Sequence, residues 1–333
     1  MTAASEAAGA AKAQAAKKQE RRERHAAARE RRRRRAAFLL RVARSAIRWL
    51  PMPVACALGH GLGTLAYAVS ARLRRQSQAH LALAMPEMPE RERRRIARRS
   101  FALLGRGALA FIVAHRMGTA RVLPSITVEG REHLDAALAQ GRGVLLVTFH
   151  FGCFEVLAAG IGSQYGARAV GRESDEDGPT AILIQMRREL GCDTIERGAP
   201  LDILRTLSAG KPVAMLVDQD TDDVHGGFVP FFGSLAHTPL GPAALAIRAR
   251  IPVVMGFIAW EGLTRHRVFV LPPVAPRADL PNDEAVLELT ARMTKLGEDE
   301  IRRRPDHWIW IHRRWETRPE DHPDYPVYRG EVR

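Results

Sequence analysis

The sequence predicts an α/β fold in which a mostly parallel central sheet is covered by helices, preceded by an N-terminal membrane-associated helical region. Three observations predict it. Short apolar runs alternate with helix-compatible stretches from residue 126 to residue 303. The 333 residues include 46% hydrophobic side chains, enough for a substantial core. Residues 49–71 contain no Asp, Glu, Lys or Arg, and this stretch is long enough to cross a bilayer.

Residues 1–35 form a basic tail, with twelve Lys or Arg and four Glu in a chain of net charge +14. We expect this tail to be disordered or partly helical, because it has too few apolar side chains to bury a core. It is suited to contact with anionic lipid or non-specific contact with nucleic acid, and a merely solubilising tail is the alternative. A nucleic-acid-binding protein is therefore a competing interpretation, although no basic motif with interleaved aromatic residues supports it.

We predict a membrane-anchoring helical segment over residues 36–75. Within it, Pro51, Pro53 and the glycines at 59, 61 and 63 argue against a simple transmembrane span. Arginines flank the apolar stretch on both sides and leave its orientation open. An embedded or re-entrant anchor on the cytoplasmic face is the preferred interpretation, and a wholly buried pair of helices is the alternative.

An α/β domain is predicted over residues 76–320, followed by a C-terminal tail, 321–333. Its first helix, 91–115, follows a turn between Pro86 and Pro89, and Ile96, Phe101, Leu104 and Phe111 are its core candidates. Further predicted helices are 133–140, 154–161, 179–190, 200–209, 239–250 and 283–303. The predicted strands are 126–129, 144–149, 167–171, 213–217, 253–259 and 268–271. An apolar loop is predicted over residues 228–238.

His150 and Glu155 form the most informative pair of residues. His150 follows the apolar run 144–149, and ligand sites of α/β folds open where parallel strands end. Gly152 permits a turn, after which Glu155 falls in the first turn of a helix, where the helix dipole favours a carboxylate. From there Glu155 is predicted to reach one ring nitrogen of His150 and leave the other free as a general base.

Alternatives for this pair remain. A histidine at a strand end, satisfied by a nearby carboxylate, need not carry out chemistry. Cys153 is a second candidate nucleophile, served by His150. The three cysteines are widely spaced and indicate a reducing compartment rather than a disulfide framework. No metal site is expected, because HExxH and CxxC motifs are absent.

Further polar clusters follow other predicted strands. Arg172 lies just past the strand ending at residue 171, and Asp218 and Asp220 lie just past the strand ending at residue 217. Taken singly, each has a structural explanation. Taken together with a base, charged groups at several strand ends indicate one site.

With these residues, the chain resembles the lauroyl/myristoyl acyltransferases of lipid A biosynthesis, relatives of the lysophospholipid acyltransferases. His150 to Glu155 resembles the family's HX4(D/E) motif, and Arg172 its following arginine. The segment from Asp218 through Phe232-Gly233 to Thr238 is similar to DQD…PFFG…T, and residues 307–320 resemble its aromatic-His-Arg-Arg ending. The chain departs at Cys153-Phe154, where many members have Asn-Trp, and at His80-Leu81, where members have Asn-Leu.

The resemblance implies a glycerolipid-acyltransferase-like fold and an acyltransferase of class EC 2.3.1. His150, held by Glu155, would deprotonate a lipid hydroxyl, which attacks an acyl thioester. Arg172 would bind a phosphate or the oxyanion, with Arg187 as a weaker phosphate candidate. Asp218 and Asp220 would orient Arg172 or sugar hydroxyls. Phe151, Phe154, Phe231 and Phe232 are candidates for the wall of an acyl groove, with core packing as the alternative.

Partners follow from the same resemblance. The acceptor is expected to be a lipid A precursor or related glycolipid, with a lysophospholipid or a phosphatidylinositol mannoside as alternatives. Acyl carrier protein is the expected donor partner, with acyl-CoA as the alternative donor; no cofactor is expected. Acyl carrier proteins are acidic, so a basic surface suits them. The expected location is the cytoplasmic face of the inner membrane of a Gram-negative bacterium. A hydrolase that activates water is a further alternative, although no GxSxG motif supports a serine version.

Overall fold

The computed structural model describes residues 31, 35, 38, 39, 41, 42, 44–171, 179–220 and 224–330. The chain divides into two compact units, of which the larger comprises residues 47–173 and 186–333. The smaller unit comprises residues 1–46 and 174–185 and includes the first part of helix α8 (Pro179–Glu189). The features described below belong to the larger unit.

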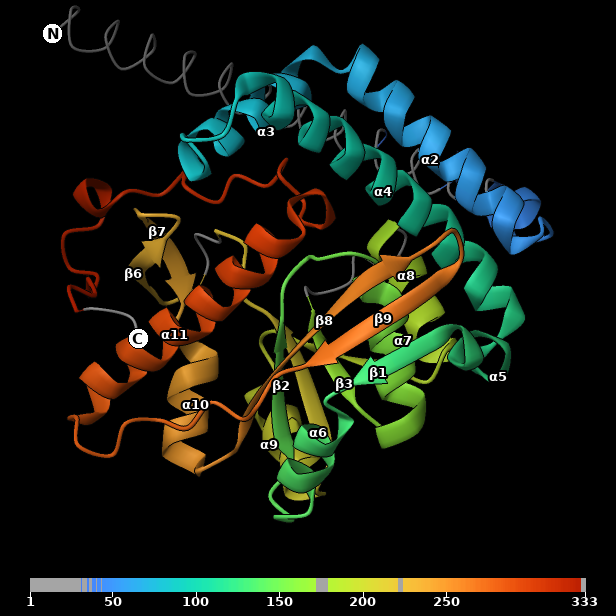
Figure 1. Ribbon diagram of the computed structural model, residues 1–333. Helices are drawn as coiled ribbons and strands as arrows, with labels where there is room; N and C mark the ends of the chain where they lie inside the picture. The colour runs from blue at the N-terminus through green and yellow to red at the C-terminus, as the bar shows by residue number, and fades with distance from the viewer. Residues whose placement is uncertain are drawn as a thin grey trace, which may run out of the picture. The chain divides into compact units, whose positions relative to one another are not determined.

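A seven-stranded sheet forms the centre of this unit, in the order β1-β9-β8-β2-β5-β3-β4 (Figure 1). The strands are β1 (Ile126–Glu129), β2 (Val144–Thr148), β3 (Arg168–Gly171), β4 (Asp193–Glu196), β5 (Pro212–Leu216), β8 (Val253–Glu261) and β9 (Arg265–Val270). The five strands from β8 to β4 are parallel, whereas β9 is antiparallel to β8 and parallel to β1. The predicted mostly parallel sheet is confirmed.

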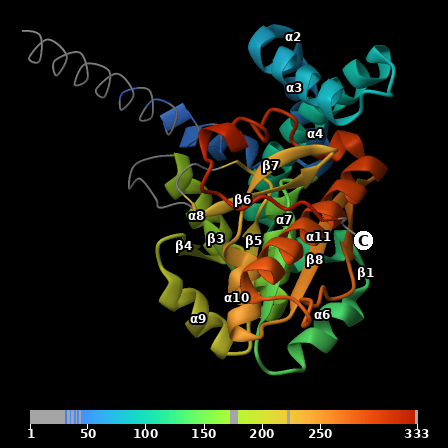
Figure 2. The ribbon, with the colours of Figure 1, turned by 90° about the vertical axis from the view of Figure 1, so that its left-hand side faces the viewer.

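Helices cover both faces of this sheet, as the apolar β2 requires. Leu145 and Val147 belong to one core cluster, whereas Val144 and Leu146 belong to the other. Helices α9 (Pro200–Ser208), α10 (Gly241–Ala249) and α11 (Asn282–Arg303) contribute to the first cluster. Helices α6 (Arg131–Leu138) and α7 (Phe154–Tyr165) contribute to the second. Figure 2 shows α10 and α11 in front of the sheet. Both faces of β2 are therefore covered by apolar side chains, so the residues that follow its carboxyl end are held in a defined position.

The predicted elements agree with the observed ones to within a few residues, with four differences. Helix α3 (Ala71–Ala84) was not predicted as a separate element. The strand β4 was missed, because its four residues, DTIE, are short and mostly polar. Leu104 is only partly buried, although Ile96, Phe101 and Phe111 are buried as predicted. The loop prediction for residues 228–238 is wrong, because this segment lies in an antiparallel hairpin of β6 (Gly226–Phe231) and β7 (Ser234–Pro239).

The turn of this hairpin explains the error. Phe231 pairs with Ser234, so Phe232 and Gly233 alone form the turn. Both have positive φ, 52° and 75°, as a two-residue type I′ turn requires. Phe is uncommon at such a φ, but here the Phe232 N–H donates to Oε2 of Glu298 over 2.6 Å. A tertiary contact therefore stabilises a turn that the local sequence does not signal.

The apolar segment forms a single helix, α2 (Met52–Val69), beside the long helix α4 (Glu90–Met117). In the sequence, α3 (Ala71–Ala84) connects these two helices. Only Ala55, Cys56, Gly59 and Gly63 of α2 are buried, so the alternative of a wholly buried helix pair is wrong. Within the described part of the chain, α2 is the one helix long and apolar enough to cross a membrane.

Glycines set the distance between α2 and α4. A Cβ on Gly63 would lie 2.0 Å from the carbonyl oxygen of Phe101, and a Cβ on Gly59 would lie 2.4 Å from that of Gly105. Small residues four positions apart allow two helix backbones to approach this closely. A Cβ on Gly61, by contrast, would meet no atom within 4 Å.

We therefore expect Gly63→Ala to lower the free energy of unfolding by about 1–3 kcal/mol, because the added methyl overlaps backbone atoms that cannot move alone. Gly61→Ala is the matched control, and we expect it to be neutral or slightly stabilising, by up to about 1 kcal/mol, because Ala favours the helix. Thermal unfolding of both variants in the same detergent measures the difference. Equal melting temperatures for the two variants would contradict the close α2–α4 packing.

Candidate active site

The pairing of β2 with β5 brings His150 and Asp218 together. Thr148, the last residue of β2, pairs with Leu216, the last residue of β5. His150 and Asp218 each follow two residues later, at the carboxyl edge where parallel sheets bind ligands. The backbone N–H of His150 donates to Oδ2 of Asp218 (2.9 Å), and Nδ1 of the ring donates to Oδ1 (2.8 Å).

Asp218 is a fully buried carboxylate that three donors satisfy. The third is the indole N–H of Trp308, 2.8 Å from Oδ2. Burial by itself would raise the pKa of Asp218, but the charge and hydrogen bond of His150 and the hydrogen bond from Trp308 outweigh burial. They lower the pKa to about 2. Asp218 is therefore an anion at neutral pH, and it fixes the proton of His150 on Nδ1.

The other ring nitrogen of His150 faces the side chain of Gln219. With the proton on Nδ1, Nε2 carries a lone pair, to which the amide nitrogen of Gln219 donates over 3.1 Å. The same amide nitrogen lies 3.2 Å from Nε2 of His312, whose ring centre is 4.9 Å from that of His150. Burial and the neighbouring His150 lower the pKa of His312 to about 4, so this ring is neutral at pH 7.

His150 itself is accessible, because 18% of its side chain is exposed. The geometry thus comprises an oriented imidazole with a basic nitrogen that an incoming hydroxyl can reach when Gln219 gives way. This is the arrangement of a general base and the group that orients it. The prediction that Glu155 binds a ring nitrogen of His150 is wrong, because Asp218 occupies that position.

The carboxylate predicted for this position was Glu155. Helix α7 begins at Phe154 and places Glu155 in its first turn, as predicted. However, both carboxylate oxygens of Glu155 accept hydrogen bonds from Arg187 of α8, over 2.6 and 2.5 Å. The two side chains are 14% and 18% exposed. Although burial would lower the pKa of Arg187, its hydrogen bonds to Glu155 raise it. The bidentate pair explains why Glu155 does not serve the imidazole.

The other predicted polar residues lie in different settings. Asp220 accepts from Nδ1 of His237 (3.1 Å) and from the backbone N–H of Thr317 (2.7 Å). It therefore ties the β6–β7 hairpin to the C-terminal segment. Arg172 itself lies outside the described residues. Arg187, a predicted phosphate ligand, uses Nε and Nη2 to bind Glu155.

The four phenylalanines predicted for an acyl groove divide into two groups. Phe151 and Phe231 are fully buried among other aromatic rings, including Phe257 and Trp308, and so belong to the core. Phe232 is also buried and lies beneath the Arg302 guanidinium. Phe154 is only partly buried and contacts the ring of His150 edge-on, 5.0 Å between centres. Phe154 alone of the four borders the candidate base.

The structure argues against Cys153 as a nucleophile. The residue is buried, and burial raises the pKa of its thiol to about 12. A buried thiol at neutral pH lacks the thiolate that attacks a thioester.

Sequence reasoning assigned no role to Trp308, His312 or Gln219. Trp308 and His312 follow α11 and the short 3-10 helix η2 (Pro305–His307), far along the chain from His150. The only signal for them was the resemblance of residues 307–320 to a family motif. Gln219 lies between two aspartates that were singled out, but an amide between charged residues gives no sign of which histidine it contacts.

Comparisons with known proteins identify the family of the chain. A family model described as bacterial lipid A biosynthesis acyltransferase matches residues 25–317. The lipid A biosynthesis lauroyltransferase of Escherichia coli K12 is 31% identical over 279 residues, 82% of this chain and 89% of that protein. The palmitoleoyltransferase of the same organism is 28% identical over 81% of this chain and 87% of its own length. A phosphatidylinositol mannoside acyltransferase of Mycobacterium tuberculosis is 25% identical over 56% of this chain and 59% of its own length. The chain therefore belongs to the bacterial lipid A biosynthesis acyltransferase family and is an acyltransferase.

Proposed function

We propose that this acyltransferase moves a fatty acyl chain from an acyl carrier protein thioester to a hydroxyl of a lipid A precursor or related glycolipid. The observation that carries the proposed chemistry is His150, whose Nδ1 is bound to the buried anion of Asp218 and whose Nε2 is held only by the amide of Gln219, in a side chain that is 18% exposed. The proposed acceptor follows from the names of the relatives. The alternative of a nucleic-acid-binding protein does not account for membership of an enzyme family.

In the proposed reaction, Nε2 of His150 takes the proton of the acceptor hydroxyl as its oxygen attacks the thioester carbonyl. Asp218, which remains ionised, stabilises the imidazolium that forms. The tetrahedral intermediate then collapses, the C–S bond breaks, and the imidazolium returns the proton to the departing thiolate. No acyl-enzyme intermediate is needed. A general base of this kind contributes about 10²- to 10⁴-fold in rate.

We place the reaction at the cytoplasmic face of the inner membrane, where both substrates meet. Helix α2 supports this proposal, because Val54, Leu58, Leu62, Leu65 and Val69 are between 44% and 73% exposed. Their spacing of three or four residues forms one apolar stripe. Such a stripe is stabilised when it enters the boundary between lipid head groups and acyl chains.

The acyl chain requires an apolar groove beside His150, because each buried methylene contributes about 0.8 kcal/mol. Phe154 supports this part of the proposal, since it is partly buried and touches the imidazole. The three other phenylalanines stabilise the core that supports it.

The function is tested by incubating the purified protein, in detergent or vesicles, with acyl carrier protein thioesters and with the matching acyl-CoA. The acceptor panel contains a lipid A precursor, a lysophospholipid and a phosphatidylinositol mannoside. We expect mass spectrometry to show one acyl chain added to the lipid A precursor from the carrier-protein thioester. Acylation of the mannoside alone would favour the activity named for the mycobacterial relative. Release of free fatty acid without any acylated lipid would reject the transferase mechanism in favour of a hydrolase.

The position of Gln219 yields a pH prediction. Gln219→Glu places a carboxylate beside Nε2 of His150 and Nε2 of His312, and a nearby negative charge favours the protonated form of an imidazole. A base is active only when deprotonated, so the acidic limb of the kcat/KM profile should move to higher pH by about one unit or more. Gln219→Ala is the control and should leave that limb near its wild-type position. Identical profiles for the Glu and Ala variants would contradict the contact of Gln219 with the base.

A further inference from the structure

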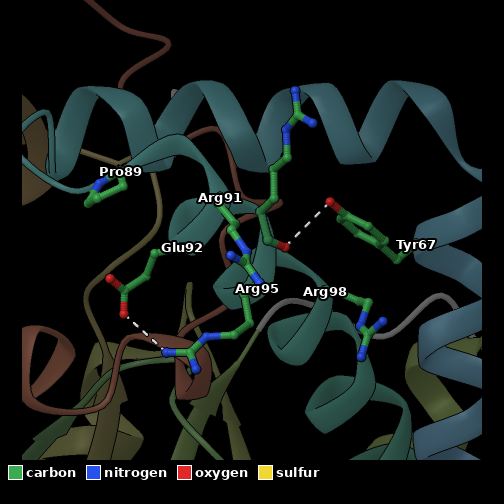
Figure 3. A pocket seen from close by; sticks show the side chains of 7 residues that line it. Tyr67, Pro89, Arg91, Glu92, Arg95 and Arg98 are labelled. Carbon is green, nitrogen blue, oxygen red and sulfur yellow. Dashed lines mark hydrogen bonds and ion pairs between the residues drawn. The ribbon is translucent and has the colours of Figure 1, made fainter.

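A cavity of about 660 Å³ lies between the end of α2 and the first half of α4, away from His150. Its lining includes Tyr67, Glu92, Arg91, Arg94, Arg95 and Arg98. Figure 3 shows the labelled arginines and Glu92 on α4, with Tyr67 opposite them. We call these six residues the arginine groove. Four positive charges face one negative charge, so the groove attracts anions.

The four arginines share one face of α4. They occupy positions 91, 94, 95 and 98, the spacing of neighbouring side chains on successive helical turns. Two of them already have partners: Arg94 binds Glu90 (2.6 Å) and Arg95 binds Glu92 (3.0 Å). These pairs are exposed, and exposed ion pairs contribute little to stability, so a stronger anion can replace the glutamates.

Arg91 and Arg98 differ from these two. Neither has an ion pair or hydrogen bond with any residue in the part of the chain that the structure describes, and both are exposed. The groove also lies at the N-terminal end of the 28-residue helix α4, where the helix dipole adds positive potential. The guanidinium fork suits the oxygens of a phosphate.

The setting identifies the source of the phosphate. Tyr67, in the last turn of α2, borders the groove, and the exposed stripe of α2 ends at Val69. Tyrosines concentrate at the level of lipid head groups, between an apolar region and water. We propose that the arginine groove binds the phosphate of an anionic phospholipid head group and thereby holds α4 against the membrane surface. This inference rests on the membrane contact in the proposed function.

Binding of the full-length protein to sedimented vesicles tests the proposal. One set of vesicles is phosphatidylcholine alone, and the other contains 30% phosphatidylglycerol. We expect wild type to bind the anionic vesicles more tightly than phosphatidylcholine. Arg91→Gln/Arg98→Gln should bind the anionic vesicles about 30-fold more weakly than wild type, from a loss of about fivefold per arginine. Its binding to phosphatidylcholine should be unchanged, because the stripe on α2 is intact.

Arg142→Gln/Arg248→Gln is the matched control. It removes the same charge from two exposed arginines, one shortly after α6 and one on α10. Helices α6 and α10 lie far from α4 in both views (Figures 1 and 2). All variants keep the basic residues 1–35, so their contribution cancels in the comparison. We expect the control to bind both vesicles within about threefold of wild type.

If both double variants bind anionic vesicles equally more weakly than wild type, the proposal of a specific arginine groove is overturned, because net charge alone would then explain the binding. A second outcome is that wild type does not bind phosphatidylcholine vesicles but binds anionic vesicles in a way that depends on Arg91 and Arg98. This result would contradict membrane binding by the apolar stripe of α2 and still support the arginine groove. If Arg91→Gln/Arg98→Gln binds vesicles like wild type but has a raised KM for the acceptor lipid, the proposal of head-group binding is overturned. The two arginines would then bind the substrate instead. Acyl transfer in detergent is measured separately, so failure of the groove is distinguishable from failure of the proposed reaction.

Discussion

Replacing His150 by Ala is expected to lower kcat for acyl transfer by about 10²- to 10⁴-fold, the usual contribution of a general base. The fold should survive, because the side chain is partly exposed and lies two residues beyond strand β2, which both core clusters hold in place. The measurement is the initial rate of acylated lipid formation, with circular dichroism to confirm folding. A folded variant with wild-type kcat would reject His150 as the base.

Asp218→Asn tests the other half of the pair. The amide is nearly isosteric but uncharged, so it can no longer hold the imidazole in the Nδ1–H tautomer or stabilise the imidazolium. We expect a loss in kcat of up to about 10⁴-fold, as found when a comparable histidine is left in the wrong tautomer. Asp220→Asn is the control two residues away. Since Asp220 contacts His237 and Thr317, it should lower the melting temperature far more than kcat. If Asp220→Asn lowered kcat more than Asp218→Asn did, Asp220 rather than Asp218 would be the residue that orients the base.

The second large effect concerns Glu155, for which sequence and structure disagree. Glu155→Met leaves the Arg187 guanidinium without its partner in a site where both side chains are mostly buried. Removing one partner of a buried pair typically costs about 3–5 kcal/mol, and the remaining exposure places our expectation near the lower limit, at about 3 kcal/mol. Urea unfolding measures it. Acyl transfer should fall as well, because the first turn of α7 also carries Phe154, which touches His150.

The double variant Glu155→Met/Arg187→Met separates structure from catalysis. Apolar residues of similar volume replace a buried ion pair at little cost, so we expect most of the lost stability to return. The neighbouring Arg188→Gln is the control: its pair with Asp193 is exposed, and its loss should cost under about 1 kcal/mol. If Glu155→Met unfolds like wild type yet loses all acyl transfer, and the double variant stays inactive, Glu155 acts on the reaction directly, as the sequence pattern predicted.

Local patterns predicted most of the sheet. β1 was predicted with its observed bounds, and β2 and β5 to within one residue. Apolar, β-branched runs between turn residues are strong local signals, because a strand covered on both faces must be apolar along its whole length. The hairpin at Phe232-Gly233 and the polar edge strand β4 lacked such signals. Glu298, 66 positions after Phe232 in the sequence, stabilises the first, and pairing with β3 stabilises the second.

The candidate site divides in the same way. The sequence by itself determined that His150 follows a parallel strand and that a helix starts at Phe154, because both depend on neighbours within a few residues. Only the tertiary structure decided which carboxylate holds the imidazole. Asp218 is 68 positions from His150, and Trp308 is 90 positions from Asp218. Hydrogen bonding between β2 and β5 brings the first two together, whereas Glu155, close in sequence, pairs with Arg187. Sequence separation does not determine distance once strands pair, so the partner of the base depends on the register of the sheet.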